Sequence, residues 1–295
     1  MELTSNIVTT PPLHAATVVL LRDGPAGMEV FLMKRHSKSD VLGGAYVFPG
    51  GKVDAADAGA DLHTRLDQPA QALHAALGEP GLDAATAAGL YVAAIREVFE
   101  ESGVLFARPT SGTTAIDLAQ AVALQRAGQD FSAVLAQSNL QLLTGALVPW
   151  ARWITPRMPS HAMAKRFDTR FFVAAVPDRQ VALHDDFETT ESLWATPRDA
   201  LALYWKQQLP MAPPQLMTLA HLARHASVAE VLQAARRQSP PTIEPEPFDS
   251  EGQRIICYPG DVHHSVPVRA VPGPSRLVYR NQRFEPLPDF DAWFA

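Results

Sequence analysis

Three glutamates and one arginine occupy six consecutive positions, from Arg96 to Glu101. Residues three and four apart share a helix face, so Glu97 would lie beside both Glu100 and Glu101. Clustered carboxylates repel one another unless a positive charge lies among them, and Mg2+ or Mn2+ takes carboxylate oxygens as ligands. The run therefore predicts a divalent-metal site, although glutamate-rich helix faces are more often plain solvated surface.

A glycine-rich segment upstream favours the metal interpretation. Residues 43–54 read Gly-Gly-Ala-Tyr-Val-Phe-Pro-Gly-Gly-Lys-Val-Asp, a short apolar strand that runs into Pro-Gly-Gly. Glycine lets the backbone approach a ligand closely, and it can leave a carbonyl free to bind a metal. A loop of this kind supplies the partner that an isolated acidic helix lacks.

Together the two segments resemble the signature of the Nudix hydrolases, G-x5-E-x7-R-E-U-x-E-E-x-G-U, in which U is aliphatic. The second half matches at every specified position from Arg96 to Val104, and the first half begins at Gly51. The first glutamate of the pattern falls on Asp57, an acid one carbon shorter. About thirty residues, over about 58–84, are inserted between the two halves. An insertion here resembles the branch that holds peroxisomal-type and bacterial coenzyme A diphosphatases.

The resemblance implies a role for each residue of the run. It makes Glu100 and Glu101 metal ligands together with the Gly51 carbonyl, and it makes Glu97 either a further metal ligand or the general base for water. Arg96 is then a catalytic-site residue that orients the carboxylates through charge-assisted bonds. The plain alternative for Arg96 is an ion pair on a helix surface, which contributes little.

Other residues are expected to complete the site. Family members often carry a further acid after the sheet, and Glu188 and Glu191 are the candidates here, with a solvated acidic loop as the alternative. Arg35 lies where it could meet outer phosphates, or on a solvated hairpin edge. Phe48 is a stacking surface for a base or simply core. Gly50 completes the expected substrate-binding set.

The activity implied is metal-dependent hydrolysis of a nucleoside diphosphate linked to another group X, by attack of an activated water on phosphorus. Coenzyme A or acyl-CoA is the first substrate expected, and ADP-ribose or NADH remains open. A protein of a different class, a Nudix-fold regulatory module that binds a nucleotide without cleaving it, is the alternative. Three adjacent acids argue against that alternative, because a pure binder does not need them.

The composition of the chain limits the classes of partner that the protein is expected to bind. The chain has 295 residues and a net charge of −6, which gives no electrostatic footprint for nucleic acid or an anionic membrane. It has one cysteine, no apolar run of about 18 residues and no signal peptide or peroxisomal tripeptide. The sequence thus predicts a cytoplasmic protein with a small-molecule substrate and no membrane or nucleic-acid partner. The family resemblance adds the expectation of a homodimer.

The pattern of elements predicts an α/β fold, and the resemblance makes it a Nudix α/β/α sandwich with a mixed sheet. Strands are expected at 14–22, 28–35, 45–48, 104–107, 147–155, 170–176 and 191–194. Helices are expected near 68–77 and at 84–102, 115–127, 130–138 and 197–207. The Nudix domain is expected over 10–208. A C-terminal extension over 209–295, packed on the main domain, would hold one or two helices at 214–237, a Pro-rich linker at 239–247 and a β-rich tail.

Two histidines in the extension have the spacing of a zinc pair. His221 and His225 are four residues apart on an expected helix. The protease motif requires a glutamate directly after the first histidine, and none is present. Histidines on an ordinary helix surface are the favoured interpretation.

Overall fold

The structure is a computed structural model that describes residues 8–37, 42–111, 116–157, 165–185 and 189–295. Its main sheet is mixed and has the order β10-β7-β8-β1-β2-β3, with β4 paired to β1 and β9 paired to β2. The strands of this sheet are β1 (Leu13–Gly24), β2 (Gly27–Arg35), β3 (Tyr46–Val47), β4 (Gly50–Lys52), β7 (Val148–Ile154), β8 (Phe167–Ala175), β9 (Thr189–Ala195) and β10 (Thr242–Ile243).

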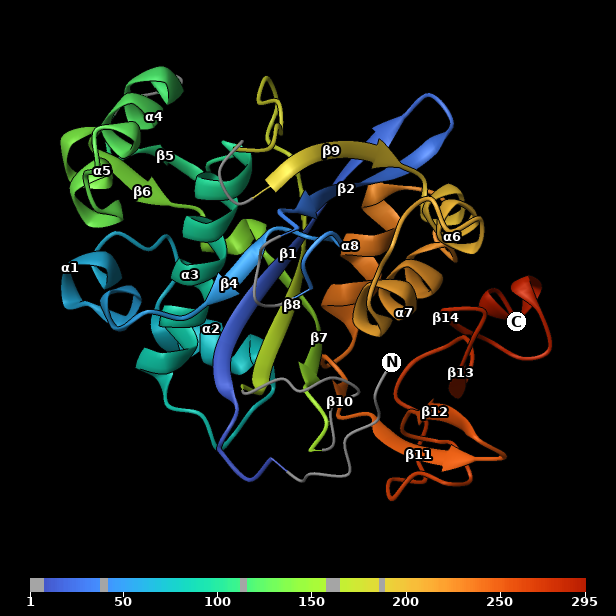
Figure 1. Cartoon of the computed structure of the whole chain (residues 1–295). Coiled ribbons are helices and arrows are strands. Elements are labelled where there is room, and N and C mark those ends of the chain that lie inside the picture. Colours follow the sequence, from blue (N-terminus) through green and yellow to red (C-terminus); the bar gives the residue numbers. More distant parts are fainter. Residues whose placement is uncertain (1–7, 38–41, 112–115, 158–164, 186–188) are drawn as a thin grey trace.

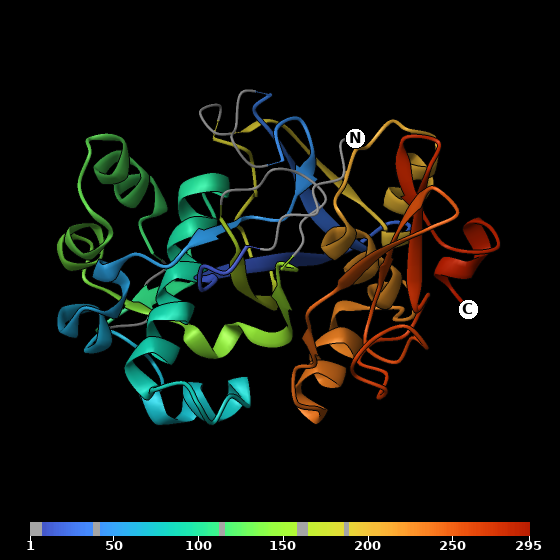
Figure 2. The ribbon, with the colours of Figure 1, turned by 60° about the horizontal axis from the view of Figure 1, so that its bottom comes forward.

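Alternation along β1 explains why helices cover both faces of the sheet. Val18 and Leu20 face a core beneath helix α3 (Ala84–Ser102), whereas Val19 and Leu21 face a second core. The second core holds side chains of α6 (Pro197–Trp205), α7 (Pro213–Leu222) and α8 (Val228–Arg237). Figures 1 and 2 both show α3 on one side of the sheet and these three helices on the other. The predicted α/β/α sandwich with a mixed sheet is confirmed.

The predicted strand at 104–107 is wrong. The segment forms β5 (Ala107–Pro109) instead, which pairs with β6 (Leu140–Leu142) in a separate small sheet. Leu105 is fully buried, yet its backbone is satisfied by a side chain: Gln180 accepts from the Leu105 N–H at 2.8 Å and donates to its carbonyl at 3.0 Å. An apolar run therefore marks burial here without strand pairing.

The insertion is more ordered than its composition indicates. A short 3-10 helix (Ala55–Ala58), α1 (Ala60–His63) and α2 (Ala70–Leu77) follow one another, and Leu73 and Leu77 of α2 are buried in the α3 core. A buried ion pair ties the end of the insertion to the sheet, because Arg170 of β8 donates to both carboxylate oxygens of Glu79. Beyond α3, the helices α4 (Leu118–Arg126) and α5 (Phe131–Gln137) match the predicted pair.

The C-terminal extension shares its core with the main sheet. Leu216, Ile243 and Trp293 belong to the same buried cluster as Val19 and Phe171. A four-stranded antiparallel sheet closes the extension, with β11 (Glu246–Ser250), β12 (Gln253–Cys257), β13 (Arg276–Arg280) and β14 (Arg283–Glu285). Figure 2 shows these strands beside the α6–α8 layer.

The predicted linker at 239–247 needs a correction. It contains β10, which pairs in parallel with β7 and so becomes an edge strand of the main sheet, and it ends in the first residues of β11. Proline at 245 lies between these strands, where no ladder bond is required of it. Among the described residues, no helix is both long and apolar enough to cross a membrane.

Candidate active site

Helix α3 presents the acidic run, and its ends are well defined. Asp83 caps the N-terminus by accepting from the Thr86 N–H at 2.9 Å, and Gly103 ends the helix at φ 71°. The acids lie in the last turns, where the helix dipole disfavours negative charge and where basic residues are normally found. The fold therefore holds carboxylates at a place that local electrostatics oppose.

Arg96 joins the two halves of the interrupted motif. Its Nε and Nη2 donate to Asp57 at 2.8 Å each, and its Nη1 donates to Glu97 at 2.8 Å and to Glu100 at 3.0 Å. Asp57 is 1% exposed, so this pairing is buried. Burial alone would disfavour the charged guanidinium, but the bond to Asp57 and the neighbouring glutamates raise the pKa of Arg96 above its usual value. Arg96 thus contacts three carboxylates and links Asp57 of the first half of the motif to Glu97 and Glu100 of the second.

The two glycines of the loop meet two glutamates. The Gly50 N–H donates to Glu101 Oε2 at 2.8 Å, and Glu101 is 4% exposed. The Glu97 carboxylate lies against Gly51, where an added Cβ would be 2.5 Å from its Cδ. The lack of a side chain at these two glycines thus lets the loop backbone approach the two glutamates closely.

The donor set has the chemistry of a site for a hard cation. Asp57, Glu97, Glu100 and Glu101 gather at the loop with Arg96 as the cation that contacts three of them. Burial raises the pKa of Glu100 above its ordinary value, although Arg96 opposes this shift. Within the described part of the chain, no three His, Cys, Asp or Glu side chains are arranged to hold an ion as they stand. The excess of carboxylate suits Mg2+ or Mn2+, provided that the glutamates turn from Arg96 and Gly50 toward the ion.

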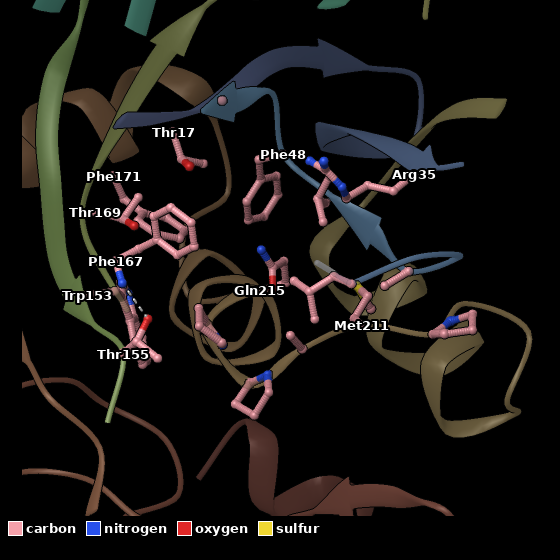
Figure 3. A pocket seen from close by; sticks show the side chains of 18 of the residues that line it. Thr17, Arg35, Phe48, Trp153, Thr155, Phe167, Thr169, Phe171, Met211 and Gln215 are labelled. Atoms are coloured by element: carbon pink, nitrogen blue, oxygen red, sulfur yellow. Dashed lines mark hydrogen bonds between the residues drawn. The ribbon is translucent and has the colours of Figure 1, made fainter. Parts of the chain in front are cut away.

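A cavity of about 860 Å³ opens beside these residues (Figure 3). Glu97, Glu101, Gly50, Gly51 and Lys52 border it from the motif. Its other walls are mainly apolar and aromatic, with Trp153, Phe167 and Phe171 from the sheet. A cavity of this size and character suits a ligand larger than a diphosphate.

Arg35 and Phe48 both line the cavity, as does Gly50. Phe48 is 2% exposed and packs edge-on against Phe171, with ring centroids 6.4 Å apart. The Nε of Arg35 is buried and, among the described residues, has no hydrogen-bond partner. The three residues expected to bind substrate therefore border one space with Glu97 and Glu101.

The two candidate acids beyond the sheet are placed differently. Glu191 lies on β9, where its Oε2 accepts from Lys34 Nζ at 3.3 Å. A hydrogen bond from Tyr46 lowers the pKa of Glu191, and this glutamate is not among the residues bordering the cavity. Glu188 lies outside the described residues. The role of either acid as a base or ligand stays a prediction.

Sequence reasoning missed the wall that the extension contributes to the cavity. Met211 and Gln215 border it from the start of α7, and Tyr279 and Phe284 border it from β13 and β14. No local motif signals this, because these residues lie more than a hundred positions from the glutamates. The insertion, by contrast, contributes none of the lining residues in the described part of the chain.

Comparisons with known proteins agree with this fold. A family model described as the NUDT19 Nudix domain matches residues 10–222. The chain is 27% identical over 234 residues to the Xenopus laevis protein named acyl-coenzyme A diphosphatase NUDT19, covering 69% of this chain and 62% of that protein. It is 28% identical over 244 residues to the Gallus gallus protein of that name, covering 70% of this chain and 64% of that protein.

A crystal structure of a NUDIX hydrolase from Alicyclobacillus acidocaldarius has the same fold. Its TM-score is 0.61 at 27% identity, and the match covers 79% of this chain and 99% of that one. The fold and the arginine–glutamate helix define a Nudix protein. The chain belongs to the NUDT19 Nudix domain family, whose model matches most of its length. It spans less than two thirds of the length of the two curated relatives.

Proposed function

We propose that this chain is a metal-dependent diphosphohydrolase that cleaves a nucleoside diphosphate linked to a group X, with coenzyme A or an acyl-CoA as the first substrate. One observation carries the proposal: Glu97 and Glu101, held against Gly51 and Gly50, border a cavity with room for a large organic group. The names of the curated relatives support the choice of coenzyme A.

Mg2+ or Mn2+ would be held by Glu97, Glu100 and Glu101 with the Gly51 carbonyl, and would neutralise diphosphate charge and lower the pKa of a bound water. Arg96 positions Glu97 and Glu100 through charge-assisted hydrogen bonds of 2.8 and 3.0 Å. Glu97, half-buried beside the loop, is the side chain proposed to hold the proton of the attacking water. Lys52 borders the same space, and its exposed Nζ, which donates to Asp54 at 2.6 Å, is proposed to meet the diphosphate as well.

The proposal is tested with purified protein, Mg2+ or Mn2+, and a panel of coenzyme A, an acyl-CoA, ADP-ribose and NADH. We expect coenzyme A to give adenosine 3′,5′-bisphosphate and 4′-phosphopantetheine. Glu100→Gln should lower kcat by more than about 100-fold. This is a larger loss than is expected for a residue that contacts a metal ligand and not the metal itself. No turnover of any substrate, together with calorimetric nucleotide binding that needs no metal, would instead establish a binding module.

A further inference from the structure

The extension supplies one wall of the cavity, and that wall is unsuited to phosphate. Residues 211–215 form it where α7 begins, and Tyr279 and Phe284 continue it. The first two helical positions of α7 are Pro213 and Pro214, which have no N–H to donate. The Gln215 N–H is used by the Ala212 carbonyl at 3.1 Å. Within the part of the chain that the structure describes, this wall therefore lacks the anion-binding site that a helix N-terminus usually provides.

Among the described residues, the extension places one basic side chain at the cavity, that of Arg283, which shares the Glu285 carboxylate with Arg280. Arg283 Nη2 forms an ion pair with Glu285 Oε1 at 2.7 Å, and its guanidinium lies 4.5 Å from the ring centroid of Trp205. The other described residues of this wall are proline, methionine, alanine, glutamine and aromatic residues. A group that binds there is expected to be uncharged.

Gln215 gives this wall a buried amide side chain. It is 7% exposed, and Figure 3 shows its side chain reaching from α7 into the cavity toward Phe48. Its Oε1 is buried and, among the described residues, accepts no hydrogen bond. Across the cavity, the indole Nε1 of Trp153 is likewise buried and unpartnered in the described part of the chain.

A buried polar atom without a hydrogen bond destabilises the protein by about 1–3 kcal/mol. A ligand that pairs with such an atom binds more tightly and in a defined orientation. Rotation of the carboxamide exchanges its oxygen and nitrogen, so Gln215 can offer an acceptor or a donor to the cavity. A secondary amide in the ligand carries the complementary N–H and C=O. Apolar walls with these groups match an uncharged chain that contains amides.

We propose that the wall formed by residues 211–215 with Tyr279 and Phe284 is the subsite for the group X, and that Gln215 selects an uncharged, amide-containing arm by hydrogen bonding. The inference rests on the proposed function, because X is the part of the substrate beyond the diphosphate. In coenzyme A that part is the pantetheine arm, which contains two secondary amides. Gln215 is thus a specificity-determining residue supplied by the extension.

Binding of D-pantetheine, which has the arm and no phosphate, tests the subsite without catalysis. Calorimetry with the full chain should detect pantetheine, and Gln215→Met should weaken its binding about tenfold, the loss of one or two neutral hydrogen bonds. Gln208→Met is the matched control, because Gln208 is exposed and is not among the lining residues. Thermal unfolding of each variant verifies folding, and an amide-free tetraethylene glycol thiol of similar length is the control ligand.

Kinetics separate this inference from the proposed function. If coenzyme A is hydrolysed, Gln215→Met should raise the KM for coenzyme A about tenfold with kcat little changed. The kinetics of ADP-ribose hydrolysis should not change. Hydrolysis of coenzyme A with unchanged KM in Gln215→Met overturns the subsite and leaves the function standing. Pantetheine binding that depends on Gln215, in a protein that hydrolyses nothing, supports the subsite and overturns the function. Undetectable pantetheine binding, or equal binding of the glycol thiol, overturns the subsite.

Discussion

Gly50 and Gly51 are adjacent glycines that the structure requires for different reasons. At Gly51 the nearest atoms to an added Cβ belong to the end of the Glu97 side chain, at 2.5 Å. At Gly50 the nearest atom is the Ala16 carbonyl oxygen, at 2.4 Å, and the backbone has φ 154°. A flexible side chain can move aside, whereas a paired backbone cannot. Gly51 therefore shapes the site, and Gly50 shapes the fold.

Gly51→Ala is expected to fold normally and to displace the Glu97 carboxylate. Hydrolysis should fall roughly 100-fold, because a misplacement of about 1 Å costs that much. Steady-state kinetics with saturating Mg2+ or Mn2+ measure the loss, and thermal unfolding verifies the fold. Turnover equal to that of the unmodified protein would contradict the placement of Glu97.

Gly50→Ala is the matched comparison, and we expect it to lower stability instead. Strained backbone of this kind costs about 1–3 kcal/mol, and the contact with Ala16 adds to it. Urea denaturation should therefore show a loss of about 2 kcal/mol or more in the free energy of unfolding. An unchanged midpoint would show that β4 can shift away from β1.

A buried network of ion pairs attaches the insertion to the main sheet. Arg170 is 2% exposed and Glu79 is 10% exposed, and the pair is joined by Asp168 of the same strand, β8, and by Arg152 of the neighbouring β7. A buried pair of this kind is costly to break, because the remaining charge loses its partner. The insertion borders no part of the cavity, so its attachment concerns stability and not substrate contact.

Glu79→Gln is expected to lower the free energy of unfolding by about 3 kcal/mol. Hydrolysis per folded molecule should stay near its unmodified value. Glu29→Gln is the control, because its partner Arg22 is half exposed and such pairs contribute less than about 1 kcal/mol. Urea denaturation of the two variants gives the comparison, and equal losses would argue against a buried anchor.

Helix α7 ends at Leu222, so it carries His221 of the disfavoured zinc pair, and His225 lies beyond the end of the helix. His221 stacks on Trp150 with ring centroids 4.3 Å apart, and burial lowers the pKa of His221 to about 4. The unfolded chain binds this proton near pH 6.5 and the folded chain does not. Stability from neutral His221 is thus fully present above pH 6.5 and is lost as pH falls toward 4.

His221→Phe should flatten the acid limb of stability, since it keeps the stacking and removes the titration. The expected difference between pH 6.5 and pH 4 is at most about 3 kcal/mol. Urea denaturation at several pH values measures it, with His263→Phe as the control because His263 is exposed. An acid limb of equal steepness in both variants would rule out His221 as its source.

At the scale of the whole molecule, the extension is part of one continuous core. Its β10 extends the main sheet beside β7, and Leu216, Tyr258 and Trp293 are buried with residues of β1 and β8. The family match also runs to residue 222, past the expected boundary at 208. That boundary stays a prediction.

Truncation after Gln208 is expected to abolish a stable fold. The deletion would expose the apolar face of the sheet around Trp153 and Phe171 and leave β7 as an unprotected edge. Size-exclusion chromatography and near-ultraviolet circular dichroism should show aggregation or loss of tertiary packing. A soluble, fully active truncated monomer would show that the extension is accessory.

The sequence by itself determined the acidic helix, its glycine-loop partner and most of the main elements. These follow from local signals: a capping aspartate at 83, a stop at Gly103, and apolar periodicity in β1 and β8. Only the tertiary structure decided where the insertion lies, that Val104–Phe106 is buried without strand pairing, and that Gln215 faces the cavity. These features depend on contacts between residues far apart in the chain, and local periodicity carries no information about such contacts.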